Sequence, residues 1–104
     1  MTWCKKLWID DVRPAPDGYI WCRTVDLAKK YIQWGEIFYG EIELIDIDHD
    51  AGEYFEYGGD YIRLLDWLEE TERNYITFHI HSMNPVGAQN MRAIIKRNGW
   101  KEIF

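Results

Sequence analysis

Apolar positions along the chain fall into short runs and into segments with helical spacing, and these alternate from one end to the other. Short runs rich in apolar, β-branched and aromatic residues predict strands at 3–9, 19–23 and 75–82, and another in the run that begins at Ile42 and ends in Asp46–Asp50. Period 2 places Ile76, Phe78 and Ile80 on one face of the strand at 75–82. Residues 100–104 are a further, shorter candidate strand.

Helical spacing with recognisable ends predicts three helices. The first is capped by Thr24 and runs to about Trp34, with Gly35 just beyond its end. The second begins at Asp60, and its apolar side is formed by Tyr61, Leu64, Leu65 and Leu68. The third follows Asn84 as N-cap and Pro85 as first residue, and ends at Asn98–Gly99. Residues 12–18 and 51–59 are predicted loops, the second a candidate lid over a strand end.

Strands that alternate with helices through short loops predict βαβ units. The expected fold class is therefore α/β, with a mainly parallel sheet, right-handed crossovers and flanking helices. With 104 residues, of which 47% are hydrophobic, the chain is expected to form one domain over residues 1–104. Ligands of such sheets bind outside the carboxyl ends of the strands, so we expect the residues that follow the strands to converge on one edge.

Acidic residues follow two of the predicted strands. Asp10, Asp11, Asp48 and Asp50 supply hard oxygen ligands, and their mutual repulsion favours a neutralising divalent cation, Mg²⁺ or Mn²⁺. A solvated acidic loop is the simpler alternative. A calcium loop starting at Asp46 is another, but that loop requires Gly where Ala51 stands and Glu where Tyr57 stands.

Two histidines lie two residues apart on the strand at 75–82. His79 and His81 point to the same face, where they are candidates for metal ligation or for an acid/base pair. The alternative for His79, deeper in the strand, is a hydrogen-bonded core histidine. His49, between two aspartates, is expected to point to the opposite face as a packing or supporting residue.

The segment 82–87 leads from a strand into a helix N-terminus, where backbone N–H groups and the helix dipole favour an anion. Ser82 and Asn84 are therefore candidate phosphate-binding residues, although both also suit turn and capping roles. Arg13 and Arg23 are candidate phosphate clamps near other strand ends, with surface ion pairs as the alternative.

Charge and composition limit the classes of ligand that the chain is expected to bind. A net charge of −6 and a pI near 4.9 disfavour binding to duplex DNA but allow a small phosphorylated ligand or an RNA end. Aromatic residues make up 16% of the chain, enough for some to line a pocket or an interface. Cys4 and Cys22 form no metal motif or disulfide framework, and no run approaches a membrane span or a signal peptide. The expected location is the cytoplasm; the oligomeric state is open.

The motifs together resemble a known family. Asp10–Asp11, Asp48 and Ser82, each after a strand, resemble the receiver domain of bacterial response regulators, in which acidic residues hold Mg²⁺ and a Ser or Thr contacts the phosphoryl group. With Arg23–Thr24, 48–50 and the long segment 81–91, the chain is more similar to the receiver-related cyclic-phosphate processing family, over nearly its whole length.

The resemblance implies a metal-dependent phosphoesterase that acts on cyclic phosphates of nucleotides or RNA ends. In this hypothesis His81, His79, Asp48 and Ser82 are catalytic. Two departures from ordinary receivers argue against aspartyl-phosphate signalling: a Pro-containing loop replaces the first helix, and no Lys follows a fifth strand, since Lys101 would start the final segment. The competing hypothesis is a non-catalytic module that binds a nucleotide or a protein partner.

Overall fold

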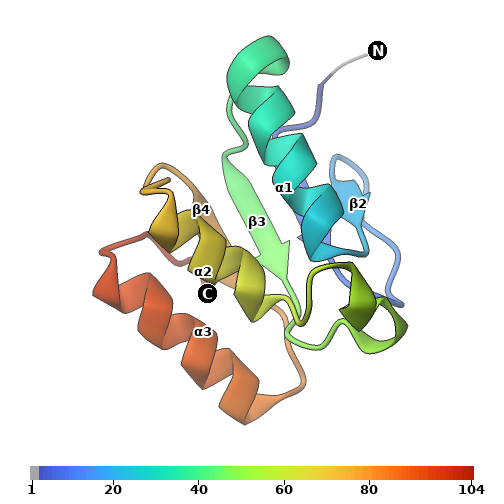
Figure 1. The fold of residues 1–104 in the computed structure, drawn as a ribbon, viewed down its shortest axis with the longest axis vertical. Coiled ribbons are helices and arrows are strands. Elements are labelled where there is room, and N and C mark those ends of the chain that lie inside the picture. Colours follow the sequence, from blue (N-terminus) through green and yellow to red (C-terminus); the bar gives the residue numbers. More distant parts are fainter. Residues whose placement is uncertain (1–2) are drawn as a thin grey trace.

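The computed structural model describes residues 3–104, which form one parallel four-stranded sheet with helices packed against it (Figure 1). The sheet has the order β2-β1-β3-β4, and every neighbouring pair is parallel. The strands are β1 (Lys6–Ile9), β2 (Ile20–Cys22), β3 (Leu44–Ile47) and β4 (Thr77–Ile80). The predicted α/β class with a parallel sheet is confirmed.

Three α-helices lie where the sequence predicts them: α1 (Val25–Trp34), α2 (Ile62–Glu70) and α3 (Pro85–Arg97). Thr24 Oγ1 accepts a hydrogen bond from the backbone N–H of Leu27, and Asn84 Oδ1 accepts one from Gly87, so both predicted N-caps are confirmed. The structure also has two shorter helical segments, the π-helix η1 (Gly35–Tyr39) and the 3-10 helix η2 (Gly52–Tyr57).

The helices all cover the same face of the sheet, because of the strand order. The steps from β2 to β3 and from β3 to β4 run in the same direction across the sheet, so right-handed crossovers place α1 and α2 on one face. α3 packs beside α2 on that face (Figure 1). The step from β1 to β2 runs the opposite way, and a helix there would cover the other face. The chain has the Pro-containing loop instead, so the second face carries no α-helix of the described chain.

Successive side chains of each strand point alternately to the face covered by the helices and to the open face. Fully buried residues point to the helices from every strand, and the largest are Leu7, Ile9, Ile45, Ile47 and Phe78. The opposite, open face carries Trp21, Trp8, Asp46 and His79 side by side, since these four residues are paired in register across the sheet. Tyr19 from the loop packs edge-on against Trp8, with ring centroids 6.0 Å apart. The loop therefore partly covers the face that a helix would otherwise fill.

The α-helix α1 ends at Trp34 with Gly35 as its C-cap, as predicted. Gly35 nevertheless has ordinary helical dihedrals (φ −59°, ψ −47°), and the chain continues as the π-helix η1. A Cβ atom there would lie 2.6 Å from the carbonyl oxygen of Gly40, so glycine also permits a close backbone approach at this point. The C-terminal segment differs from expectation. Residues 100–104 do not form the expected strand: they make one isolated parallel bridge, between Phe78 and Glu102.

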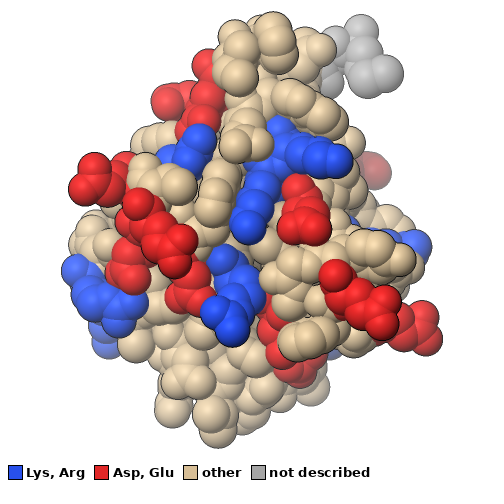
Figure 2. All heavy atoms as spheres, in the orientation of Figure 1, with Lys and Arg blue, Asp and Glu red and all other residues tan. Residues whose placement is uncertain are grey.

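The helical face of the surface has no large area of one charge. Figure 2 shows acidic and basic side chains interspersed over it, and an uncharged end where Figure 1 shows η1. Ile37, Phe38 and Tyr39 of η1 are more than half exposed. Within residues 3–104, none of the helices has the length and apolar character that crossing a membrane requires.

Candidate active site

The site is formed by two successive rows of side chains on the open face of the sheet. The inner row is Trp21, Trp8, Asp46 and His79, one residue from each strand. Two residues further along, past the strand ends, period 2 gives the outer row Arg23, Asp10, Asp48 and His81. Backbone hydrogen bonds from Asp10, Asp48 and His81 to neighbouring strands continue the ladder to this row. The predicted convergence of strand ends thus brings together residues far apart in the sequence.

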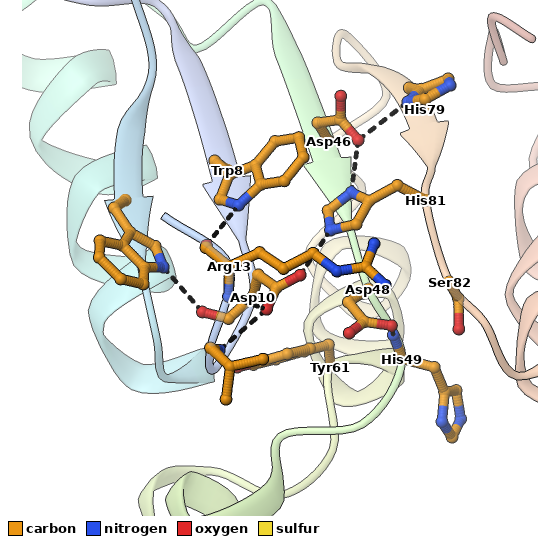
Figure 3. Close-up of polar contacts among 12 residues, drawn as sticks. Trp8, Asp10, Arg13, Asp46, Asp48, His49, Tyr61, His79, His81 and Ser82 are labelled. Carbon is orange, nitrogen blue, oxygen red and sulfur yellow. Dashed lines mark hydrogen bonds and ion pairs between the residues drawn. The ribbon is translucent and has the colours of Figure 1, made fainter. Parts of the chain in front are cut away.

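His81 lies between two carboxylates, as Figure 3 shows. Its Nδ1 is 2.6 Å from Asp46 Oδ1, and its Nε2 is 2.9 Å from Asp10 Oδ2. The His81 side chain is 9% exposed, those of Asp46 and Asp10 10% and 0%. His79 Nδ1 lies 2.9 Å from the same Asp46 oxygen. Asp46 therefore links both histidines to the sheet.

These contacts decide which form of His81 is stable. Ionised carboxylates only accept hydrogen bonds, so a ring that bonds one on each side needs a proton on each nitrogen. Burial opposes the charged form, but the hydrogen bonds to Asp46 and Asp10 outweigh it and raise the pKa of His81 above its usual value. Burial likewise raises the pKa of Asp46, and the hydrogen bonds from the two histidines more than reverse this. The arrangement favours an imidazolium held between two carboxylates.

The ring of His81 is also fixed from one side. It stacks on Trp8 with centroids 4.0 Å apart and planes 5° from parallel. The indole Nε1 of Trp8 donates to the carbonyl oxygen of Arg13, 2.9 Å away, which fixes the indole in turn. A cation over an indole face is favourable, so Trp8 both orients the His81 ring and stabilises its charged form.

Most of the hydrogen-bond acceptor capacity of the Asp10 carboxylate is already used. Burial raises its pKa, but hydrogen bonds from the backbone N–H groups of Arg13 and Val12, and the contact with His81, lower it overall. Its Oδ1 accepts both N–H groups and its Oδ2 contacts His81. Since each carboxylate oxygen has two lone pairs, Asp10 can offer about one more, from Oδ2. Asp48 accepts one bond, at Oδ1 from the N–H of His49, and so has more to offer.

A divalent cation fits the two carboxylates present. Asp10, Asp48 and His81 each bring one polar atom to within 4.8 Å of the others. An imidazolium has no lone pair to offer a metal, so Asp10 and Asp48 are the residues that could hold the cation, with His81 beside it. Two carboxylates that share a site suit Mg²⁺ or Mn²⁺. Asp11 lies close by: burial raises its pKa, and the charges of Asp10 and Asp48 add to that shift. Its carboxylate lies against Gly52, where a Cβ atom would overlap it.

Asp50, the fourth acidic candidate, lies in a different group. Its Oδ1 is 2.7 Å from His49 Nδ1, and both residues gather with Asp60 in a second cluster of possible ligands. The His49 ring points away from His81 in Figure 3. It packs on α3 at Gly87, where a Cβ atom would overlap the ring. This contact agrees with the expectation that His49 points to the opposite face as a packing or supporting residue.

Ser82 and Asn84 both hold the turn into α3. Ser82 Oγ accepts from the N–H of Asn84 at 3.0 Å, and Asn84 Oδ1 accepts from the N–H of Gly87 at 2.9 Å. Each side-chain oxygen therefore bonds backbone already. What they can still offer an anion is the Ser82 hydroxyl proton and the Asn84 amide hydrogens.

Arg23 is the first residue of the outer row, and Arg13 lies in the loop after β1. The side chain of Arg13 extends across the site towards Asp48 and His81 in Figure 3. The guanidinium of Arg23 lies over the Trp21 ring, with its Cζ 4.1 Å from the ring centroid, and donates to the Tyr54 hydroxyl at 3.3 Å.

Asp46, Trp8 and Trp21 belong to the site and were not among the residues selected from the sequence. Period 2 puts Asp46 on the same face of its strand as Asp48, and the same rule applied to the first two strands puts Trp8 and Trp21 on the faces of Asp10 and Arg23. The sequence does not give the register between distant strands, and it is the register that puts Trp8 beside Asp46 and Asp46 beside His79.

Comparisons with known proteins identify one family. A family model described as the cyclic-phosphate processing receiver domain matches residues 5–97, which include both rows of the site. Comparisons with curated proteins and with solved structures gave no match. The fold and the positions of the motifs are thus supported by one family-level similarity.

Proposed function

The chain belongs to the cyclic-phosphate processing receiver domain family, and from this premise we propose that it is a metal-dependent phosphoesterase that opens cyclic phosphates of nucleotides or RNA ends. The observation that carries the proposal is the meeting of Asp10, Asp48 and His81, from the ends of three strands, with ligand atoms within 4.8 Å of one another. An acidic pair alone would be explained by solvation. Solvation does not explain a largely buried histidine that is fixed between two aspartates.

Asp10 and Asp48 are the residues that would hold the cation, with Asp11 adjacent. A bound Mg²⁺ or Mn²⁺ supplies Lewis acidity towards a phosphoryl oxygen and lowers the pKa of a coordinated water. The protein's contribution is to hold Asp10 rigidly. The two N–H groups at Oδ1 and the His81 contact at Oδ2 fix the orientation of this carboxylate before any ligand arrives.

His81 is the proposed general acid. Ring opening forms a bond from water oxygen to phosphorus and breaks one phosphorus–ribose oxygen bond, and the departing oxygen needs a proton. The imidazolium would supply it from Nε2, whose N–H leaves Asp10 for the departing oxygen, and the neutral ring would then recover the proton that the water loses, so the cycle closes. Asp46 acts as a positioning residue, since it holds Nδ1 and keeps the ring charged. His79 bonds the same oxygen and supports Asp46.

The phosphate has donors on two sides in this proposal. The Ser82 hydroxyl, the Asn84 amide and the N-terminus of α3 lie at the end of β4, and Arg13 extends over the site from the loop after β1. Such donors would neutralise charge on the non-bridging oxygens, as in other phosphoryl-transfer sites.

The direct test is turnover of 2′,3′-cyclic AMP by the purified chain with Mg²⁺, with Mn²⁺ or with EDTA. The products are detected by ³¹P NMR. We expect 2′-AMP or 3′-AMP with a metal present and none with EDTA. Asp48→Asn should reduce kcat/KM at least about 100-fold, because loss of a ligand costs more than loss of a supporting contact. The matched control is Asp66→Asn, which changes a surface carboxylate paired with Arg63 on α2 and should have no effect.

Absence of product with either metal, or equal turnover by wild type and Asp48→Asn, would remove the catalytic proposal. The remaining candidate is then a non-catalytic nucleotide-binding module. One observation favours it: both nitrogens of His81 already bond carboxylates, an arrangement that also suits a structural ion pair. Binding of the cyclic nucleotide that persists in EDTA, with the ligand recovered unchanged, would identify such a module.

A further inference from the structure

The arginines of the described chain divide into two groups. Four pair with a carboxylate within ion-pair distance: Arg63 with Asp66, Arg73 with Glu36, Arg92 with Glu102 and Arg97 with Glu69. Arg13 and Arg23 pair with no carboxylate anywhere in residues 3–104, although the chain has a net charge of −6. Both lie beside the candidate active site. Their positive charge is therefore available to a ligand.

Arg23 differs from Arg13 in being part of an aromatic stack. Its Cζ lies 4.1 Å from the centroid of the Trp21 ring and 5.7 Å from that of the Tyr54 ring, and the Tyr54 hydroxyl accepts a hydrogen bond from its Nη1. Arg23 itself remains exposed, and Phe55 and Tyr57, which lie close to Tyr54 in the chain on η2, are 59% and 54% exposed. The guanidinium is therefore a flat, exposed cation held on an indole.

The stack is tied rigidly to the catalytic groups. Trp21 Nε1 donates to the backbone carbonyl of Asp10 at 2.8 Å. The Tyr61 hydroxyl donates to the carbonyl of Arg23 at 2.7 Å, and burial strongly raises the pKa of this hydroxyl, so it stays protonated and keeps the bond. A ligand on the stack would therefore sit at a fixed position relative to Asp10.

We propose that Trp21, Arg23 and Tyr54 form a nucleobase subsite, so that the substrate is a nucleoside 2′,3′-cyclic phosphate unit whose base stacks on Arg23. This inference rests on the proposed function and specifies its substrate. Both Lys and Arg bind phosphate, Lys as a point charge and Arg through its planar fork, but only the guanidinium also offers a flat surface on which a planar π system can stack. Unpaired bases stack on aromatic and guanidinium planes in single-stranded RNA recognition.

The experiment compares kcat/KM for three substrates: 2′,3′-cyclic AMP, a trinucleotide that ends in an adenosine 2′,3′-cyclic phosphate, and base-free methyl riboside 2,3-cyclic phosphate. We expect wild type to prefer the substrates with a base by about tenfold or more, the usual effect of one stacked base. A trinucleotide preferred over cyclic AMP points to RNA ends as the source, and equal rates point to the free nucleotide. Both results support the subsite.

Variants test the stack itself through the ratio of kcat/KM with a base to kcat/KM without one. Arg23→Lys keeps the charge and removes the plane, and should reduce the ratio to near one. Tyr54→Leu should reduce it partly, and Tyr54→Phe, which keeps the ring, should preserve it better. Arg63→Lys, an exposed arginine of α2, is the matched control and should leave the ratio as in wild type.

The proposal can fail separately from the catalytic one. If wild type turns over the base-free substrate as well as cyclic AMP, or if Arg23→Lys keeps the full ratio, the subsite is wrong while the phosphoesterase stands. If nothing is turned over, the subsite is tested by binding. Tryptophan fluorescence would report the affinities for 3′-AMP and for base-free ribose 3-phosphate. Tighter binding of 3′-AMP that Arg23→Lys abolishes supports the subsite, and equal binding overturns it.

Discussion

Two clusters of histidine and aspartate lie at the same edge of the sheet, and they are built differently. The His81 cluster joins Asp10 after β1 with Asp46 and Asp48 of β3 and its end. The side chains of His81, Asp46 and Asp10 are at most 10% exposed, and that of His79 is 35% exposed. The His49 cluster joins Asp50 and Asp60, and Asp50 is 60% exposed. Both contain groups that bind metals. The His81 ring has a carboxylate on each nitrogen, whereas the His49 ring has one, from its own neighbour in the chain.

The difference teaches that donor type alone does not define a site. Exposed pairs between sequence neighbours contribute little and perturb little, because water screens them. Burial lowers the pKa of His81 and raises those of Asp10 and Asp46, but hydrogen bonds and charges from partners in distant segments outweigh it, so that the pKa of His81 is raised and those of Asp10 and Asp46 are lowered. Perturbed groups that lie together are the usual mark of a functional site.

The largest expected effect separates the two histidines by activity. His81→Gln should reduce kcat for the cyclic nucleotide by about 10² to 10⁴-fold, the usual contribution of a general acid. His49→Gln should cost less than about tenfold, as for a supporting residue. Circular dichroism should show both variants folded. Equal losses in the two variants would mean that the clusters act together and that the distinction drawn above is wrong.

The next effect is on stability, measured in EDTA as the free energy of unfolding in urea against pH. The pKa of His81 is raised on folding, so its contribution is complete below about 6.5 and is lost as the pH rises through the folded pKa. The pKa values of Asp10 and Asp46 are lowered, so their contribution is present above 3.8 and is lost as the pH falls through the folded pKa. Stability from this cluster is therefore greatest between about pH 3.8 and 6.5.

His81→Gln sharpens that test. In wild type, the free energy of unfolding should fall above pH 6.5 with a slope of up to about 1.4 kcal/mol per pH unit, the value for one proton. The variant should lose this slope, and His49→Gln should keep it. A wild-type curve that is flat from pH 6 to 9 would contradict the imidazolium between two carboxylates.

Much of this arrangement follows from the sequence, because periodicity and end signals are local. Thr24 and Asn84 cap helices by bonds to residues three positions away, and the order of strands and helices follows from the apolar pattern. The rule for parallel sheets then brings Asp10, Asp48 and His81 to one edge. These parts of the fold and the site require no knowledge of packing.

Other parts depend on contacts between distant segments. Gly35 follows the end of α1 as predicted, but its second role, the close approach of the Gly40 carbonyl, depends on the fold and is not visible in the sequence. Asp48 and Asp50 are alike in the sequence and differ in the fold, because period 2 leaves Asp48 facing Asp10 while Asp50 lies beyond the strand and bonds His49. The role of Asp46 depends on its register with His79, which no local pattern gives.

The smallest expected effect tests whether His49 is a packing residue. Gly87 is inside α3, where Ala should stabilise the helix by up to about 1 kcal/mol. A Cβ at this position overlaps the His49 ring, so in wild type Gly87→Ala should instead destabilise the protein by about 1–3 kcal/mol, as overpacking does. In a His49→Ala background the space is open, and the same substitution should become stabilising.

The four proteins are wild type, the two single variants and the double variant. Their free energies of unfolding in urea show whether the sign changes, and so measure the coupling between positions 49 and 87 directly. Gly99→Ala is the control for a glycine that cannot be replaced for a different reason: φ there is +68° and nothing lies within 4 Å, so its cost should be the same with or without His49. If Gly87→Ala has the same effect in both backgrounds, His49 does not hold α3, and its ring is free to serve the site after all.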